Sequence, residues 1–186
     1  KGTMKVEGNL IHESGTLKVG GGKLEVGGDY RMQKENVDTV GKISYTYGIG
    51  TLYMTNDNDY VLINGEFVDE SQNSMTGKLT AGTMEVKGNF TQKNGSYSNF
   101  NTSGTHTVIL SGNQKQIISF ESSSSHFNNL KLTKDKETGY TFSPDNCWKN
   151  LYLDTDVKAV SVSPSEPTVY QNDTQQFLAK VEGINK

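Results

Sequence analysis

Short segments in which apolar and other residues alternate recur along the chain. Residues 2–10 (GTMKVEGNL), 22–30 (GKLEVGGDY) and 82–90 (GTMEVKGNF) share one pattern: Gly, any residue, Leu or Met, any residue, Val, any residue, Gly, Asn or Asp, and a large apolar residue. In the third copy Met84 and Val86 fall on one side of a strand, and Glu85 falls on the other. Period-two alternation is typical of a strand with one buried face. Each copy therefore predicts a short strand that ends in a corner at its second glycine.

The spacing of the copies indicates how these strands are arranged. With the looser copies VLINGEF (61–67) and VILSGN (108–113), the second glycines are Gly8, Gly28, Gly65, Gly88 and Gly112, at intervals of 20, 37, 23 and 24 residues. Such a unit is too short to contain a helix, and no window has a 3.6-residue period, so it suits one coil of a β-solenoid. The interval of 37 is long enough to hold an extra turn, because residues 42–54 (KISYTYGIGTLYM) also alternate.

A second repeat lies further along the chain. FNNLKL (127–132) and WKNLYL (148–153) match with an offset of 21 residues. In a solenoid, residues one coil apart lie at strand spacing, about 4.8 Å. Asn129 and Asn150 would then form a ladder, unless both are simply turn-forming residues. The offset also predicts three stacked pairs: Phe127 with Trp148, Leu130 with Leu151, and Leu132 with Leu153.

The pattern predicts an all-β fold, a right-handed parallel β-helix or β-solenoid over residues 1–156, with coils of about 20–24 residues and no helix longer than two turns. An antiparallel sandwich of hairpins is the alternative. The long string at 15–30 (GTLKVGGGKLEVGGDY), which is echoed at 77–90 (GKLTAGTMEVKGNF), favours the solenoid. The core of the solenoid is predicted to be one stack of the apolar residues that precede the repeat glycines: Val6, Val26, Ile63, Val86 and Leu110.

Composition narrows the functional classes. The chain has 186 residues, 20 of them glycine, and glycine suits sharp corners because it takes a positive φ without steric cost. The net charge is -3 and Arg31 is the only arginine, so a nucleic-acid partner is not expected. No run approaches the roughly 18 apolar residues of a membrane helix, so membrane insertion is not expected either. Cys147 is the only cysteine, which excludes an intrachain disulfide.

The repeat pattern of the sequence ends near residue 157. Residues 157–184 read VKAVSVSPSEPTVYQNDTQQFLAKVEGI, and this string resembles the opening of a bacterial immunoglobulin-like (Big) domain at residues 160–164, 168–169, 174–177 and 179–181. The resemblance implies a secreted or cell-surface protein of Gram-positive bacteria, with neighbouring domains in the same polypeptide. A whole domain of this kind needs about 80–100 residues. We therefore expect residues 157–186 to be a partial Ig-like segment, either packed as a cap on the solenoid or truncated.

Residues 82–153 are similar to repeats of large clostridial-type surface proteins. The similarity rests on the strings HTVILSGN (106–113), KQIISF (115–120) and FNNLKL (127–132). It implies an extracellular setting and no particular activity.

Tyrosines supply one candidate binding site. Five of the nine tyrosines lie within residues 30–60, and Tyr45, Tyr47, Tyr53 and Tyr60 are the candidate ligand-binding residues. An exposed tyrosine offers a rigid apolar ring with a polar tip, which suits stacking on a sugar ring. The alternative is that the rings pack inside the solenoid or on a sheet face, one in each coil.

Acidic residues supply a candidate metal site. Asp57 and Asp59, in the string TNDNDY, present carboxylates at alternate positions, as calcium prefers, although the string does not fit an EF-hand loop. The alternative is a polar turn. No other cofactor is expected. The three histidines, His12, His106 and His126, are isolated in sequence and fall in no catalytic motif, so we expect surface or packing roles for them and no enzymatic activity.

These observations lead to three functional hypotheses. The first is a non-catalytic structural or adhesive module of a secreted or cell-wall-associated protein, which spaces or displays neighbouring domains. The second is a carbohydrate-binding module that uses the tyrosines to bind a glycan, or a host or cell-wall component. The third, more distant, is a polysaccharide-active β-helix enzyme.

Overall fold

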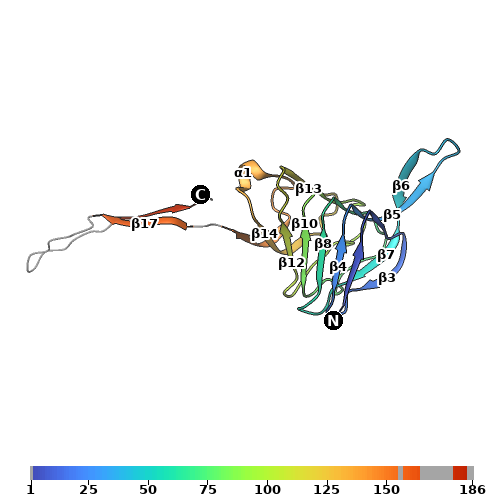
Figure 1. The fold of residues 1–186 in the computed structure, drawn as a ribbon, viewed down its shortest axis with the longest axis horizontal. Helices are drawn as coiled ribbons and strands as arrows, with labels where there is room; N and C mark the ends of the chain where they lie inside the picture. Colours follow the sequence, from blue (N-terminus) through green and yellow to red (C-terminus); the bar gives the residue numbers. More distant parts are fainter. Residues whose placement is uncertain (1, 155–156, 164–177, 184–186) are drawn as a thin grey trace, which may run out of the picture.

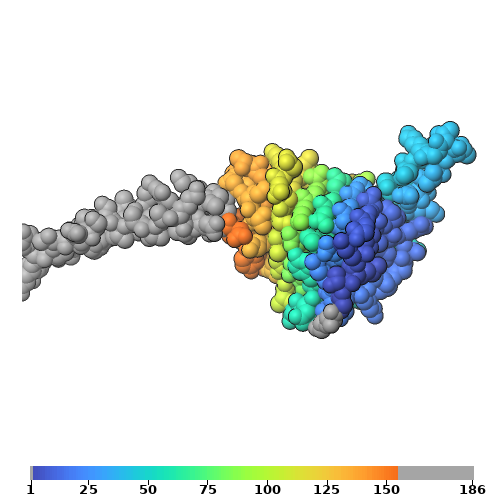
Figure 2. Space-filling view, viewed as in Figure 1, coloured from blue at the N-terminus to red at the C-terminus, as the bar shows by residue number. Residues whose placement is uncertain are grey.

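The chain winds into a parallel β-solenoid (Figure 1). The structure is a computed structural model that describes residues 2–154, 157–163 and 178–183. Residues 2–154 form about six coils, and each coil contributes one strand to a first sheet and the next strand to a second sheet. The coils follow one another along the molecule as successive bands of colour in Figure 2. The predicted all-β, parallel solenoid is confirmed.

Three sheets form the sides of the coils. Sheet A is entirely parallel and runs in the order β1 (Thr3–Val6), β4 (Lys23–Val26), β8 (Tyr60–Ile63), β10 (Thr83–Val86), β12 (Thr107–Leu110), β14 (Phe127–Leu132) and β16 (Trp148–Leu153). Sheet B runs in the order β2 (Leu10–Ile11), β5 (Tyr30–Val37), β9 (Phe67–Asp69), β11 (Phe90–Gln92), β13 (Gln116–Phe120) and β15 (Tyr140–Ser143). Sheet C is the pair β3 (Ser14–Lys18) and β7 (Ile49–Tyr53).

Helical structure is almost absent from the described residues. The one helix there is α1 (Lys136–Gly139), which has four residues. Its N-cap is Asp135, whose carboxylate accepts the N–H groups of Glu137 and Thr138. The absence of a longer helix in this part of the chain agrees with the sequence. No described helix has the length and apolar character needed to cross a membrane.

The apolar stack of sheet A follows the predicted register. Val6 pairs with Val26, and the row continues through Ile63, Val86 and Leu110. All are fully buried except Val6, which is half-buried because its strand is the first of the sheet. The alternating segments therefore form one continuous core, as predicted.

The second repeat also pairs as predicted. Strands β14 and β16 are parallel, and Phe127 lies beside Trp148, Leu130 beside Leu151 and Leu132 beside Leu153. The Asn150 Nδ2 group donates to Asn129 Oδ1 at 3.0 Å, so the asparagine ladder is present. Leu151 and Leu153 remain partly exposed because β16 is the last strand of sheet A.

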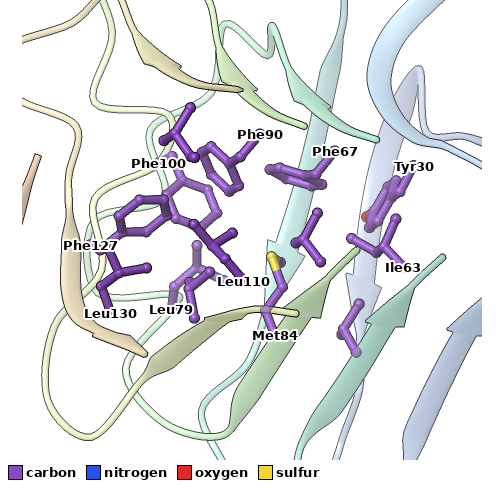
Figure 3. Packing of buried hydrophobic residues seen from close by; sticks show 14 of the residues in the cluster. Tyr30, Ile63, Phe67, Leu79, Met84, Phe90, Phe100, Leu110, Phe127 and Leu130 are labelled. Carbon is purple, nitrogen blue, oxygen red and sulfur yellow. The ribbon is translucent and has the colours of Figure 1, made fainter. Parts of the chain in front are cut away.

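Aromatic side chains fill the middle of the solenoid (Figure 3). Phe67 and Phe90 from sheet B lie 5.1 Å apart between ring centroids. Phe90 also contacts Phe100 at 4.8 Å and Phe127 at 4.8 Å, both edge to face. Such pairs stabilise a core beyond the burial of their area. The aromatic cluster ties the third side of the coil, which carries Phe100, to sheets A and B.

The repeat glycines are required by close packing of coils. Gly28, Gly65, Gly88 and Gly112 have φ values outside the left-handed region, so the positive φ expected from composition is not their reason. A Cβ atom on Gly88 would lie 2.4 Å from the Gly65 carbonyl oxygen, and one on Gly112 would lie 1.8 Å from that of Lys87. Both distances are shorter than van der Waals contact. The glycine at the corner therefore makes room for the preceding coil.

The Asn or Asp that follows Gly8, Gly28 and Gly88 caps the next coil. Asn9 Oδ1 accepts the Asp29 N–H at 2.8 Å, and Asp29 Oδ1 accepts the Glu66 N–H at 2.9 Å. Two coils later, Asn89 Oδ1 accepts the Ile117 N–H at 2.8 Å. Each side chain supplies the acceptor that a corner N–H lacks when the backbone ladder is interrupted. The Gly-Asn/Asp pair is thus the corner element of the repeat.

The interval of 37 residues does not contain an extra coil, although its length would allow one. Strand β4 pairs directly with β8, with Leu24 beside Val61. The additional residues include β6 (Ile43–Tyr47), which folds back and pairs antiparallel with the end of β5. The first pair is Gln33 with Tyr47, and the last pair is Val37 with Ile43. The resulting hairpin, residues 33–47, projects from the body of the solenoid (Figures 1 and 2) and is called the arm below. The alternating pattern of residues 42–54 therefore corresponds to two strands, β6 and β7, that do not form a further coil.

The C-terminal residues contain a second local hairpin. Strands β17 (Val157–Ser163) and β18 (Leu178–Gly183) pair antiparallel, with Val160 beside Val181. Half of the string that resembles a Big domain, residues 164–177, lies outside the described residues. The prediction of a partial Ig-like segment over 157–186 therefore stays a prediction.

Candidate functional site

The structure distributes the four candidate tyrosines over three strands. Tyr45 and Tyr47 lie on the same face of β6 in the arm, Tyr53 lies on β7 in sheet C, and Tyr60 lies on β8 in sheet A. The Tyr45 hydroxyl donates to Glu35 at 3.2 Å, and the Arg31 guanidinium lies 4.9 Å from its ring centroid. Tyr47 is 55% exposed. Only the two tyrosines of the arm are brought together.

Tyr53 and Tyr60 are engaged by neighbouring side chains of the solenoid. The ammonium groups of Lys18 and Lys78 lie 5.3 and 5.7 Å from the Tyr53 ring centroid. The Lys23 ammonium lies 5.4 Å from the Tyr60 ring, and the Tyr60 hydroxyl donates to Glu85. Burial and then this carboxylate raise the pKa of Tyr60 above its ordinary value. Both rings therefore have ammonium partners, and Tyr60 has a carboxylate partner as well.

A small cavity lies where the arm leaves the solenoid. It has a volume of about 170 Å³ and is lined by Glu13, Lys34, Tyr47, Gly48 and Ile49; we call it the arm notch. The Lys34 ammonium lies 3.6 Å from the Glu13 carboxylate, and both side chains are about half exposed. Tyr47 and Ile49 add two apolar surfaces, and Ile49 is 52% exposed. Sequence reasoning identified only Tyr47 among these residues.

Backbone packing fixes the shape of the arm notch. The Ile49 N–H donates to the Glu13 carbonyl oxygen at 2.7 Å, which joins β7 to the first coil. A Cβ atom on Gly48 would lie 2.9 Å from that same oxygen and 3.2 Å from the Met32 carbonyl oxygen. A glycine is therefore needed where the arm returns to the solenoid. The notch combines a ring, an aliphatic surface, a carboxylate acceptor and an ammonium donor, which suits a small ligand with apolar faces and hydroxyl groups.

The candidate calcium residues lie in the turn before β8. Asp59 is buried, and its carboxylate accepts the backbone N–H groups of Gly21, Thr55 at 2.9 Å and Asn56 at 3.0 Å. Asp57 is exposed and accepts the Thr105 hydroxyl at 3.0 Å. Within the described residues, no three His, Cys, Asp or Glu side chains are grouped as metal ligands. Asp59 anchors its turn to the preceding coil, and calcium binding stays a prediction.

Two of the histidines take part in packing. His12 forms a hydrogen bond with the Tyr30 hydroxyl at 2.9 Å and lies next to the Gly15 carbonyl at 3.2 Å. His106 is fully buried, and its Nδ1–H donates to the Ala81 carbonyl at 2.9 Å. Burial lowers the pKa of His106 to about 4, so the ring is neutral at pH 7.

A buried polar cluster was missed from the sequence. Asp69 Oδ1 accepts the Ser71 N–H at 3.0 Å and the Asn99 amide at 3.2 Å, while the Gln92 amide donates to Asn99 Oδ1 at 2.6 Å. Asp69 Oδ2 is buried without a partner, and burial raises the pKa of this carboxyl group well above its ordinary value. The parity of FVD (67–69) and FTQ (90–92) places Asp69 and Gln92 on the same side as the buried phenylalanines, and this signal could have revealed the cluster.

Comparison of the chain with protein-family models, with curated proteins and with solved structures finds no match. The features available for a functional proposal are therefore the stack of coils, the arm and the arm notch.

Proposed function

We propose that the chain is a non-catalytic structural and adhesive module of a secreted or cell-wall-associated bacterial surface protein. The observation that carries this proposal is the unbroken stack of coils with one arm projecting from it. Strands in a sheet are about 4.8 Å apart, so the seven strands of sheet A span roughly 30 Å along the solenoid axis. Such a body is suited to spacing and displaying neighbouring domains.

The adhesive part of the proposal rests on the arm. Val37, Val40 and Ile43, around its tip, are 61%, 86% and 52% exposed. Apolar side chains grouped on a projecting surface are typical of interaction sites. The arm adds no strand to the stack of coils, because β4 pairs directly with β8. A binding role explains its presence better than a contribution to the core does.

The cellular setting of the proposal comes from the sequence. The resemblance of residues 157–184 to a Big domain supports an extracellular, cell-surface location with neighbouring domains in the same polypeptide as partners. Right-handed winding of the solenoid is part of the same proposal, because parallel crossovers are right-handed in nearly all proteins.

Binding of the intact chain to cell-wall preparations and to host-cell surfaces tests the adhesive role. Val40→Ser and Ile43→Ser should lower surface binding at least fivefold without changing the thermal midpoint, because both side chains are exposed. The matched control is Ile117→Ser, since Ile117 is 55% exposed on β13, outside the arm. Equal binding by all three variants and the parent chain would remove the arm from the proposal.

Carbohydrate binding at the arm notch is the second candidate function. It is favoured by the exposed Tyr47 ring beside the Glu13–Lys34 pair. Stacking on an aromatic ring contributes about 0.5–1.5 kcal/mol, so Tyr47→Ala should weaken glycan binding roughly twofold to twelvefold. Tyr152→Ala is the control, because Tyr152 is 53% exposed on β16. A glycan array with no ligand, or a ligand indifferent to Tyr47→Ala, would argue against the notch.

The non-catalytic part of the proposal has its own test. Incubation with plant, host and bacterial polysaccharides should release no reducing ends and no unsaturated products. Release that is abolished by Asp57→Asn or Asp59→Asn would favour the polysaccharide-active enzyme instead.

A further inference from the structure

The first coil ends all three sheets on one side of the molecule. Strand β1 is the first strand of sheet A, β2 is the first strand of sheet B in the order given above, and β3 forms one edge of sheet C. We call this end, made by residues 2–19, the β1 face. Within the described residues, the outer edges of these three strands face no other strand. An edge of this kind is a template for adding another strand.

Side chains on the β1 face match buried residues of the next coil. Met4 pairs with Leu24, yet Met4 is 57% exposed and Leu24 is 2% exposed. Leu17 pairs with Leu52, and only Leu52 is fully buried. Beside Met4 and Leu17 lies a cavity of about 310 Å³. Core positions of the first coil are therefore open because nothing covers them from this side.

Gly8 is a glycine that its own surroundings do not require. Its equivalents Gly28, Gly65, Gly88 and Gly112 would each place a Cβ atom between 1.8 and 2.4 Å from an atom of the preceding coil. At Gly8 no heavy atom lies within 4 Å of that position, and its φ is outside the left-handed region. The one role that glycine has at this corner is to admit a preceding coil. Gly8 is suited to a neighbour that residues 2–154 do not provide.

Corner capping points to the same neighbour. Each capping Asn or Asp accepts the N–H at the equivalent position one coil later, as Asn9 does for Asp29 and Asp29 does for Glu66. By the same geometry, the Asn9 N–H is placed to donate to the side-chain oxygen of an Asn or Asp in a coil before it. The β1 face therefore favours an occupant that has the shape of a coil and carries an Asn or Asp at its corner.

We propose that the β1 face binds one further coil of the same repeat, supplied by the same polypeptide and wound in parallel onto β1. The coil carries the pattern Gly, any residue, Leu or Met, any residue, Val, any residue, Gly, Asn or Asp, and a large apolar residue. Its Leu or Met lies over Met4, its Val over Val6 and its corner over Gly8. Continuity supports this occupant, because every coil junction in residues 2–154 joins consecutive segments of one chain in this register. The proposal is independent of the adhesive role.

The test compares the chain of 186 residues with an extended chain in which a copy of residues 81–104 precedes Lys1. Residues 81–104 lead into Thr107 of β12 with the same spacing that the added copy has to Thr3 of β1. Gly8→Ala should leave the thermal midpoint of the original chain unchanged within about 1 °C. In the extended chain it should lower the midpoint by about 4 °C or more, because the new Cβ then meets the added coil.

Oxidation of Met4 by hydrogen peroxide gives a second, local measurement. Met4 should oxidise at least fivefold more slowly in the extended chain than in the original chain. A scrambled copy of residues 81–104 is the control and should give no protection. If the extended chain aggregates, a synthetic peptide of residues 81–104 should protect Met4 of the original chain and fail to protect it in the Gly8→Ala variant.

Three outcomes would overturn the proposal. The first is a loss of stability caused by Gly8→Ala in the original chain, which would show that the glycine serves its own coil. The second is an extended chain in which Gly8→Ala has no effect and Met4 oxidises at the original rate. The third is self-association of the original chain, measured by sedimentation and abolished by Gly8→Ala, which would make a second copy the occupant.

Discussion

Individual buried polar groups in the solenoid hold protonation states that differ from those in the unfolded chain. Asp69 lies in the row of inward positions next to Gln92 and is fully buried. His106 lies at a corner. Its Nδ1 is hydrogen-bonded to the Ala81 carbonyl oxygen, and its Nε2 is buried without a hydrogen-bond partner. Because burial disfavours the charged form of each group, stability at these two sites depends on pH with opposite signs.

Asp69→Asn should increase the free energy of unfolding at pH 7. The raised pKa means that native Asp69 retains its proton above the ordinary value of 3.8, so the free energy of unfolding falls as pH rises from about 4 through the raised pKa. The amide keeps the Oδ1 acceptor and removes this dependence. Denaturant titrations between pH 4 and 8 provide the measurement. Asp145→Asn, at an exposed site, is the control and should leave the slope unchanged.

His106 should titrate near pH 4 in the native state. Its pKa is lowered from 6.5 to about 4 by burial, so the unfolded chain binds a proton that the native state excludes between these values. The contribution to stability is fully present above about pH 6.5 and falls by roughly 3 kcal/mol as pH drops to about 4. NMR titration of the ring protons, with denaturation in the Asp69→Asn background, separates this group from Asp69. A midpoint near 6.5 would contradict the burial of His106.

Corners and strands of the solenoid are specified by different sequence signals. Strand register follows from repeated strings, because a residue and its copy one period later occupy equivalent places, as Leu130 and Leu151 do. The corner follows from the Gly-Asn/Asp pair, where glycine admits the preceding coil and the side chain caps the next one. An element that interrupts the repeat, such as the arm, has neither signal.

Gly88→Ala should destabilise the solenoid strongly. The added Cβ would lie 2.4 Å from the Gly65 carbonyl oxygen, and its three nearest atoms are all backbone atoms, which limits relaxation, so we expect a loss of about 2–3 kcal/mol. Gly95→Ala is the matched control. Gly95 is exposed, and its φ is not left-handed. A Cβ atom added to Gly95 would lie 3.4 Å from its nearest neighbour, the Glu121 carbonyl oxygen. Urea denaturation of the two variants compares them directly, and equal stability would mean that the corner yields easily.

Sequence could predict the strands of sheet A but not the partners of every strand. Met84 to Val86 alternate and recur, so both their buried face and their neighbours follow from the repeat. Residues 43–47 also alternate, yet local antiparallel pairing with β5 competes with stacking, and nothing in the alternation decides between the two. The arm notch could not be predicted, because Tyr47 reaches Lys34 only through that hairpin, in which Gln33 pairs with Tyr47 and Lys34 with Thr46.

The whole molecule behaves as a row of coils, each in contact with its immediate neighbours. Sheet A has seven strands and the aromatic core is continuous, but every strand pair within the stack joins adjacent coils. In such an assembly, the free energy of unfolding is close to the sum of the intrinsic stability of each coil and the interaction energy of each interface between adjacent coils. A part that lies outside the row, such as the arm, should contribute little to that sum.

Excision of the arm should leave the solenoid folded. Replacing residues 35–45 by Asn-Gly joins Lys34 to Thr46, which are already paired, through the type of turn that favours a two-residue hairpin loop. We expect the thermal midpoint to stay within about 2 °C, with surface binding lost if the arm is adhesive. Loss of a cooperative transition in calorimetry would show instead that the arm supports the second coil.

The corner glycines also constrain how such a protein can change over generations. A mutation at Gly88 is deleterious because of the coil before it, so selection at one position reflects backbone encoded about 20–24 residues upstream. Loss of part of a coil would leave a glycine facing the wrong neighbour, whereas gain or loss of one whole period preserves every junction. Genes for solenoids of this kind should therefore lengthen and shorten in whole repeats, while insertions accumulate where the arm leaves the coil.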